Sequence, residues 1–167
     1  MDIIRFAMQM EIDGQKFYEQ SAAEASLPEL KEIFSYLAEE EKRHFRFFKS
    51  MADGKPDVAG KELSGGSVTA TRNIFVGLIE SGAHKSFGDE VTVAWKKARE
   101  IEEQAVKLYS EEVTRESDPQ RKALLQKIAD EEKNHVYLIE NVLSYLMDPG
   151  AFANSQRFAA FKSWEGH

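Results

Sequence analysis

Two segments of this chain, residues 11–44 and residues 102–135, carry the same pattern of side chains at a constant separation of 91 positions. Each segment has a glutamate with a tyrosine seven positions after it, and a Glu-x-x-His pair thirty positions after that glutamate. An internal repeat of this kind indicates that one structural unit occurs twice in tandem. The repeated residues are Glu11, Tyr18, Glu41 and His44 in the first segment and Glu102, Tyr109, Glu132 and His135 in the second.

Each copy of the repeat reads as two helices joined by a tight turn, because apolar residues recur every three or four positions on both sides of a proline. A helix from about Met1 to Ala25 should end before Pro28, since proline disfavours helix in the residue before it but is accepted at a helix start. The turn of the second copy contains Pro119, and Asp89 is the candidate N-cap of the preceding helix. Four long helices in two hairpins predict an all-α four-helix bundle.

The chain length fits one domain with a sizeable core. The stretch between the two hairpins is rich in Gly, Ser and Thr and includes one short helix, expected over residues 68–81. The predicted organisation is a four-helix bundle over residues 1–147, made of a hairpin at 1–51, a long crossover connector at 52–88 and a hairpin at 89–147, followed by an aromatic C-terminal tail at 148–167.

The connector is much longer than a turn between neighbouring helices requires. It could run the length of the bundle or exchange a hairpin with a second chain, and we expect a homodimer. The tail holds Phe152, Phe158, Phe161 and Trp164. Because these are too many aromatic side chains to leave in water, we expect the tail to dock on its own bundle or on another subunit.

Helix geometry brings the repeated polar residues together. Glu11 and Glu41 lie on opposite sides of the first turn and, at about 1.5 Å per residue, each lies roughly 21 to 23 Å from it, so the folded hairpin sets them side by side. The two members of each Glu-x-x-His pair are neighbours on one helix face. Seven residues are close to two helical turns, so Tyr18 should stand over Glu11, and Tyr109 over Glu102, on the inward apolar stripes.

Four glutamates in the apolar interior of a bundle are costly unless something neutralises them. Two divalent cations would balance four carboxylates, and nitrogen and oxygen ligands without sulfur suit iron or manganese, with zinc also possible. The tyrosine hydroxyls are suitable hydrogen-bond donors to metal-binding carboxylates. The candidate metal ligands, which are also the candidate catalytic residues, are Glu11, Glu41, His44, Glu102, Glu132 and His135, with Tyr18 and Tyr109 as their hydrogen-bond donors.

A single Glu-x-x-His in a helix rich in Glu and Lys is usually part of a solvated face. Two copies on apolar stripes at one separation, each with a matching tyrosine, favour a metal site instead. His84 and His167 have no partner at ligand spacing, and we assign them no role. The residues beside the ligands that are expected to face solvent are Glu39, Glu40, Lys42, Arg43, Asp130, Glu131, Lys133 and Asn134.

Composition excludes several other kinds of site. The 167 residues include no cysteine, which rules out disulfides, thiolate nucleophiles and cysteine-held iron within this sequence. A net charge of −7, with Lys and Arg interleaved with Glu, argues against a nucleic-acid surface. No apolar run is long enough to cross a bilayer, and the start has no basic segment leading into an apolar run. We therefore expect a cytoplasmic protein that binds neither membrane nor nucleic acid.

Among helical bundles with buried carboxylate and histidine ligands, the chain resembles the rubrerythrin family. The resemblance is carried by MQMEIDGQKFY at residues 8–18 and AEEEKRH at residues 38–44, and it extends over roughly residues 1–147. It implies a ferritin-like bundle with a non-haem di-iron centre that reduces hydrogen peroxide while iron cycles between the ferrous and ferric states. In the roles that the resemblance implies, Glu41 and Glu132 bridge the metals, Glu11 and Glu102 are terminal carboxylates, and His44 and His135 each bind one metal.

The chain departs from the family pattern in two ways. Typical rubrerythrins have a rubredoxin-like domain in which four cysteines hold an electron-transfer iron. Since these residues include no cysteine, electrons would come from a separate protein such as a rubredoxin. Typical rubrerythrins also carry a further glutamate on the third long helix, about one turn from the first. Here the positions on the same face as Glu102 are Ala98, Arg99, Ala105 and Val106.

Three functions follow from this pattern, and we rank them in this order. The first is a di-iron oxidoreductase that acts on peroxide, or on oxygen. The second is a ferritin-like protein that oxidises or binds iron, which would form a large hollow assembly and take up many irons per chain. The third is a helical interaction module with a vestigial metal site, which would bind no stoichiometric metal and lose little stability on chelation.

Overall fold

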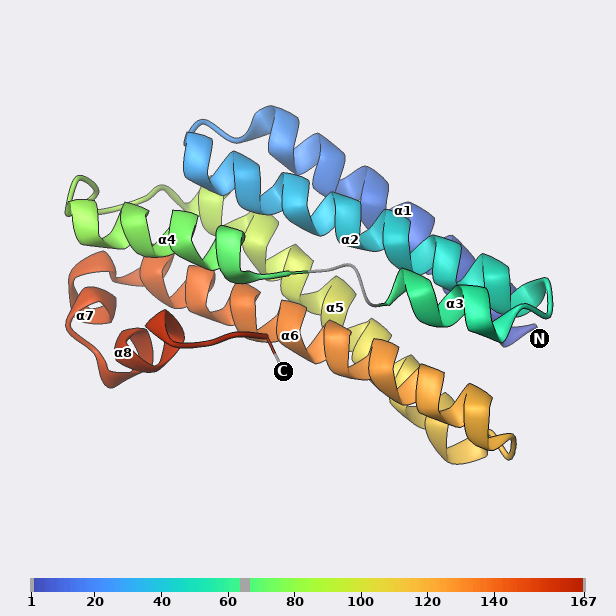
Figure 1. Ribbon diagram of the computed structural model, residues 1–167. Helices are drawn as coiled ribbons and strands as arrows, with labels where there is room; N and C mark the ends of the chain where they lie inside the picture. The colour runs from blue at the N-terminus through green and yellow to red at the C-terminus, as the bar shows by residue number, and fades with distance from the viewer. Residues whose placement is uncertain (1, 64–66, 167) are drawn as a thin grey trace.

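The computed structural model describes residues 2–63 and 67–166, and the regular structure in these ranges is entirely α-helical. The expectations for Met1, for positions 64–66 of the connector and for His167 concern residues outside the described ranges. Nowhere in the described chain is a helix both long and apolar enough to cross a membrane. Two antiparallel hairpins form the body of the molecule (Figure 1), α1 (Ile3–Glu24) with α2 (Pro28–Ala52) and α5 (Asp89–Arg115) with α6 (Pro119–Met147). The predicted all-α bundle of two repeated hairpins is confirmed.

The ends of the long helices follow from local residues. Pro28 and Pro119 occupy the first turns of α2 and α6, where the missing N–H breaks no helical hydrogen bond. Asp118 caps α6 by accepting a hydrogen bond from a backbone N–H of the first turn at 2.8 Å. The prediction that Asp89 caps α5 is wrong, because Gly88 takes the extended N-cap conformation and Asp89 is the first helical residue. At that position its negative charge still favours the helix start.

The connector between the hairpins contains two helices, α3 (Pro56–Glu62) and α4 (Thr69–Ser81), where we expected one. Helix α3 packs on α2 and reaches α6, and α4 contacts both α2 and α6. Figure 1 shows the two helices following one another along the space between the hairpins. The connector therefore runs back along the bundle and covers the side on which α2 and α6 face each other.

The C-terminal tail forms two short helices, α7 (Pro149–Ala153) and α8 (Gln156–Lys162), which fold back against α4 and α6. All three phenylalanines of the tail are buried, and the ring of Phe161 lies 5.5 Å from that of Phe75 in α4. Trp164 packs edge-on against a tyrosine of α6. The tail thus docks on its own bundle.

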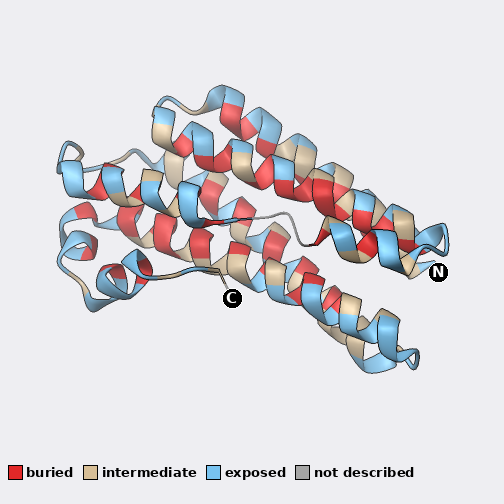
Figure 2. Ribbon diagram, viewed as in Figure 1, coloured by how far each residue is buried: buried red, intermediate tan, exposed pale blue. Residues whose placement is uncertain are grey.

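The buried residues line the inward faces of the four long helices (Figure 2). They form two apolar clusters, one that includes Phe34 and Trp95 near the turn between α1 and α2, and one that includes Phe48 and Ile128 towards the other end of the hairpins. Along each long helix, the buried glutamates and histidines lie between residues of the two clusters. Apolar packing therefore closes a polar interior from both ends.

Candidate metal centre

The six predicted ligand residues meet in the middle of the bundle, with a glutamate from each of α1 and α5 and a Glu-x-x-His pair from each of α2 and α6. None of the six is more than 3% exposed. Donor atoms of the two Glu-x-x-His pairs all lie within 4.8 Å of one another, close enough to hold a metal ion. The Nδ1 atoms of the two histidines face the remaining glutamates, with His44 Nδ1 3.8 Å from Glu11 Oε2 and His135 Nδ1 3.5 Å from Glu102 Oε1.

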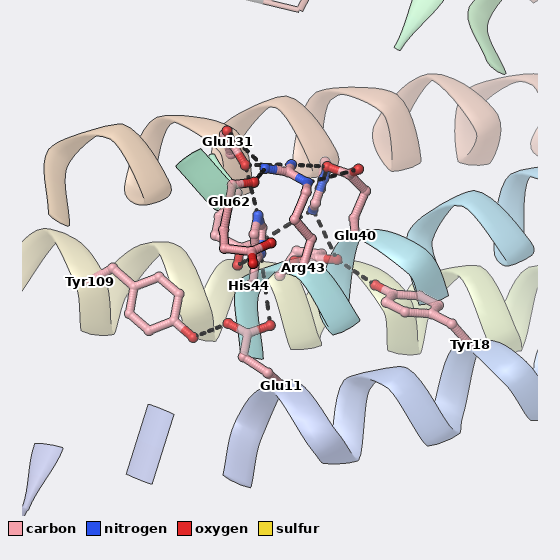
Figure 3. Close-up of polar contacts among 11 residues, drawn as sticks. Glu11, Tyr18, Glu40, Arg43, His44, Glu62, Tyr109 and Glu131 are labelled. Atoms are coloured by element: carbon pink, nitrogen blue, oxygen red, sulfur yellow. Dashed lines mark hydrogen bonds and ion pairs between the residues drawn. The ribbon is translucent and has the colours of Figure 1, made fainter. Parts of the chain in front are cut away.

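The two tyrosines bind the terminal glutamates across the hairpins. The Tyr18 hydroxyl donates to Glu102 Oε1 at 2.7 Å, and the Tyr109 hydroxyl donates to Glu11 (Figure 3). Each tyrosine lies on the same buried face as the glutamate of its own helix, as predicted. Its hydroxyl nevertheless donates to the glutamate of the other hairpin, because α1 and α5 lie antiparallel, which sets Tyr18 level with Glu102. Burial, followed by the charges of the neighbouring glutamates, raises the pKa of both tyrosines well above the usual value. Both hydroxyls therefore remain protonated hydrogen-bond donors.

Several buried ligand atoms have no hydrogen-bond partner among the described residues. His44 Nδ1 lies 2.9 Å from Glu132 Oε1, but the two atoms do not form a hydrogen bond. A buried polar atom without a partner costs about 1–3 kcal/mol, and such atoms occur on all four long helices. Bound cations would remove this penalty. The atoms without a hydrogen bond are Glu11 Oε2, Glu41 Oε1, Glu102 Oε2, His44 Nδ1 and Glu132 Oε1, of which the last two form an ion pair with each other.

The four inner glutamates differ in how readily they ionise. Burial raises the pKa of Glu41 well above its usual value, and the charges of Glu11 and Glu102 raise it further. Burial and the charge of Glu132 also raise the pKa of Glu11. Burial works against the ionised form of Glu102 too, but the charge and hydrogen bond of His135 lower its pKa on balance. Protons or metal cations are therefore needed to balance this cluster.

The two histidines respond to the same charges. Burial alone would lower the pKa of His44, but the carboxylates of Glu132 and Glu131 raise it to about 10. Burial is likewise overcome at His135, where Glu102 contributes most to a pKa raised well above the usual value. Both rings are therefore protonated near neutral pH in the metal-free protein. A metal ion that binds them must displace these protons.

A further layer of charged groups surrounds the outer side of the two histidines. Glu40 and Arg43 are buried and Glu131 is half-buried, so the prediction that these three residues are solvated is wrong. One Nη atom of Arg43 donates to Glu40 and, at 2.7 Å, to Glu131 (Figure 3). The outer carboxylates also approach the outer ring nitrogens, with Glu131 Oε2 2.8 Å from His44 Nε2 and Glu40 Oε2 3.4 Å from His135 Nε2.

Both outer carboxylates are ionised at neutral pH. Burial would raise the pKa of Glu40, but hydrogen bonds and charges from His135 and Arg43 bring it to about 2. The pKa of Glu131 is also lowered, because His44 and Arg43 together outweigh burial. The outer layer thus holds two negative charges and one positive charge beside the candidate metal site.

The helical pattern did not predict that Glu40, Arg43 and Glu131 are shielded from solvent, because it does not show which other segment covers them. Nη1 of Arg43 donates to the backbone carbonyl of Glu62, at the end of α3, at 2.6 Å. The connector therefore covers a helix position that would face water on an isolated hairpin. The repeat contained a usable signal, since Glu40 and Glu131 recur at the same separation of 91 positions as the ligands. Of the other flanking residues, Glu39, Asp130 and Lys133 are exposed as predicted, whereas Lys42 and Asn134 are half-buried.

One glycine of α1 allows a ligand to approach closely. A Cβ atom added at Gly14 would lie 2.7 Å from Glu41 Oε2 and 3.1 Å from its Cδ, which is closer than such atoms can come without displacement. The repeat places Ala105, not glycine, at the corresponding position of α5. The two halves of the centre are therefore similar but not identical.

Helix α5, which is described in full, has only one buried acid, Glu102. Glu100 and Glu103 are exposed and lie within 4.0 Å of Lys97 and Arg99 respectively. The face towards the centre instead presents buried alanines one turn before and after Glu102. No further carboxylate of α5 reaches the cluster, as the sequence indicated.

A small cavity of about 70 Å³ lies on the outer side of the candidate centre. Its volume exceeds the roughly 10–15 Å³ that one water requires, so it can hold molecules of the size of water or peroxide. Its walls include side chains that touch the ligands and backbone from the C-terminal segment. The lining residues are Tyr36, Glu40, Arg43, Val68, Glu131, Asn134, His135, Glu165 and Gly166.

The ligand set is chemically suited to a redox metal. Carboxylate oxygens and imidazole nitrogens without sulfur are ligands for iron, manganese and zinc. The unpartnered, buried donor atoms on all four long helices fit metal ions better than they fit an ordinary bundle core, where buried polar groups are hydrogen-bonded.

In a comparison with protein families, a family model called Rubrerythrin matches residues 2–143. No curated protein and no solved structure matches the chain. The family match covers most of the chain and includes the six candidate ligands and both tyrosines. Together with the helical fold and the buried Glu and His cluster, it shows that this chain belongs to the rubrerythrin family.

Proposed function

We propose that the protein is a non-haem di-iron oxidoreductase that reduces hydrogen peroxide with electrons from a separate redox protein. The observation that carries this proposal is the set of unpartnered ligand atoms buried between the two hairpins. Family membership favours iron, while the donor atoms would also accept manganese or zinc. In the proposed centre, with the roles that the family resemblance implies, Glu41 and Glu132 would be shared by two metal ions, Glu11 and Glu102 would be terminal ligands, and His44 and His135 would each bind one ion.

The charges of the cluster support a pair of divalent ions. Four ionised glutamates carry four negative charges, and two divalent ions cancel them. When bound, two ferrous ions that become ferric supply the two electrons that convert hydrogen peroxide and two protons into two waters. Burial and then the repulsion between carboxylates raise the pKa of Glu11 and Glu41, and bound cations would remove the repulsive part.

The chain's own residues prepare this chemistry in three ways. The tyrosine hydroxyls hold the terminal carboxylates in place by donating hydrogen bonds to Glu11 and Glu102. The two apolar clusters exclude bulk water from both ends of the centre, which strengthens the interaction between charges. The outer cavity beside His135 leaves room for a small oxidant next to the ligands.

Electrons would come from outside this sequence. Its residues include no cysteine, so they cannot form the cysteine-held iron of a rubredoxin-like domain. A separate protein such as a rubredoxin is the proposed donor. We also propose a homodimer in the cytoplasm, and light scattering at micromolar concentration that finds only monomer would refute the dimer.

The proposal is tested by anaerobic titration of metal-free protein with ferrous iron, followed by rapid mixing with hydrogen peroxide or with oxygenated buffer. We expect saturation at two irons per chain and faster oxidation by peroxide. The matched pair Glu102→Gln and Glu103→Gln separates ligand loss from loss of surface charge, because the two positions are adjacent on α5 but only Glu102 is buried. Only Glu102→Gln should lower the iron stoichiometry. Absence of iron binding by the unmodified protein would refute the proposal.

The second candidate is an iron-oxidising or iron-binding protein, as in ferritins. The observation in its favour is that α5 provides no further buried carboxylate, so the chain lacks one feature of typical rubrerythrins. This candidate predicts uptake of far more than two irons per chain, oxygen as the better oxidant, and a large assembly in gel filtration. Failure to bind any metal would instead favour the helical interaction module.

A further inference from the structure

The repeat that supplies the ligands is not preserved at Arg43, a buried polar position beside them. The inner ligands, the tyrosines and the outer carboxylates Glu40 and Glu131 all recur at a separation of 91 positions. Arg43, however, corresponds to Asn134. One half of the centre therefore has a buried guanidinium where the other half has an amide.

The Arg43 guanidinium joins the two halves of the outer layer. Its Nη2 atom donates to Glu40 from the first hairpin and to Glu131 from the second. Each of these carboxylates lies against the outer nitrogen of the histidine in the opposite hairpin, at 2.8 Å for His44 Nε2 and 3.4 Å for His135 Nε2. The side chain of Arg43 is only 9% exposed.

We infer that Arg43 is a positioning residue for both histidines of the metal centre. By holding Glu40 and Glu131 it fixes the carboxylate that hydrogen-bonds His44 Nε2 and the carboxylate that forms an ion pair with His135 Nε2, and so keeps both Nδ1 atoms directed at the inner glutamates. A metal-binding histidine is oriented by the group that accepts from its other nitrogen. The inference rests on the proposed metal centre and adds to it a residue outside the ligand set.

One arginine is suited to this task because its donors form a planar fork. A guanidinium binds carboxylates through several N–H groups in fixed directions, and here a third direction is used by Nη1, which donates to the carbonyl of Glu62. This contact anchors the side chain to α3. A lysine would bring the same charge but only a compact ammonium, which cannot hold two carboxylates and the carbonyl in a fixed arrangement.

The negative charges of Glu40 and Glu131 are also stabilised by a cation between them. Among the residues that the structure describes, Glu40 and Glu131 would otherwise be two ionised carboxylates in a largely buried site with only histidine nitrogens as partners. Asn134 does not substitute for Arg43 on the other side, since its Nδ2 donates to the backbone carbonyl of Gly166. The corresponding position of the second hairpin therefore holds the C-terminal segment and not the outer carboxylates.

The test uses the full metal-free chain with Co²⁺ as the probe, and compares Arg43→Asn, Arg43→Lys and the control Arg46→Asn. Arg46 lies on the same helix, carries the same charge and also contacts Glu62, but its side chain is 52% exposed. Folding of each variant is checked by circular dichroism and thermal unfolding. Competition with a chelator then gives the Co²⁺ affinity, and the shifted proton resonances of the Co²⁺ protein report the two outer imidazole N–H groups.

We expect Arg43→Asn to weaken Co²⁺ binding by about 10–100-fold, as for other partners that orient metal ligands, and to expose both outer N–H groups to rapid solvent exchange. Arg43→Lys should retain one protected N–H and an intermediate affinity. Arg46→Asn should keep both resonances and an affinity within about threefold, since an exposed ion pair contributes little.

Wild-type affinity with both N–H resonances protected in Arg43→Asn would overturn the inference while leaving the metal centre intact. If Arg43→Asn does not fold, Arg43→Lys decides the matter, because it keeps the buried charge and removes only the fork. Wild-type behaviour of Arg43→Lys in both measurements would then overturn it. Absence of Co²⁺ binding by the unmodified protein would overturn the proposed metal centre itself.

Discussion

Replacing Gly14 with alanine should stabilise the metal-free protein and weaken the metal-loaded one. Gly14 lies inside α1, where alanine is favoured over glycine by about 0.5–1 kcal/mol. The new methyl group would, however, lie 2.7 Å from Glu41 Oε2. Without a metal, the flexible end of the Glu41 side chain can move away, so the gain in helix propensity should prevail.

The expected loss of metal affinity follows from the distance that the Glu41 carboxylate must move. Ordinary contact with a Cβ atom begins at 3.4 Å, so Oε2 of Glu41 must move by about 0.7 Å, whereas metal–ligand distances are maintained within roughly 0.2 Å. We therefore expect at least about a tenfold loss of metal affinity. At a fixed excess of metal, a tenfold weaker site removes about 1.4 kcal/mol of the stabilisation that metal binding provides.

The assay is urea unfolding with and without Zn²⁺, and Gly77→Ala is the control. Gly77 also lies inside a helix, α4, but nothing lies within 4 Å of a Cβ atom added there. Gly77→Ala should raise the free energy of unfolding equally with and without metal. If Gly14→Ala keeps the full metal-dependent increase seen in the unmodified protein, the steric reasoning is wrong.

Three further results are expected. Metal-free protein should lose stability as pH rises from about 6.5 to 10, by up to about 1.4 kcal/mol per pH unit for each imidazole, because the pKa of His44 is raised to about 10 and that of His135 is also raised. Urea unfolding at successive pH values measures this, and stability that is flat or rising over that range would contradict it. Tyr109→Phe leaves a buried oxygen of Glu11 without its donor and should lower the free energy of unfolding by about 1–3 kcal/mol, whereas Tyr137→Phe, at a half-buried tyrosine of α6, should change it by less. Chelation of the metal-loaded protein should lower the midpoint of thermal unfolding, and the histidines should take up protons when the metal leaves. Calorimetry in buffers of different ionisation enthalpy should detect that proton uptake. A vestigial site would show neither effect.

The amino-acid sequence was sufficient for the parts of this protein that depend on one helix at a time. Hydrophobic periodicity, Pro28 and Pro119 determine four long helices and the turns between them. The repeat of Glu11 and Glu102 and of the two Glu-x-x-His pairs places all six candidate ligands on inward faces, and each is buried. Position along a helix fixes the angle of a side chain around its axis, so these residues could be identified without knowing how the helices pack.

Tertiary structure decided whatever depends on the contact between elements. Tyr18 and Tyr109 donate to glutamates of the opposite hairpin, which follows from the antiparallel register of α1 and α5 and from no local pattern. Arg43 became buried because the connector covers it and accepts its hydrogen bond at Glu62. Periodicity predicts on which face of its own helix a side chain lies. Its burial and its hydrogen-bond partners depend on which other segments pack against that face.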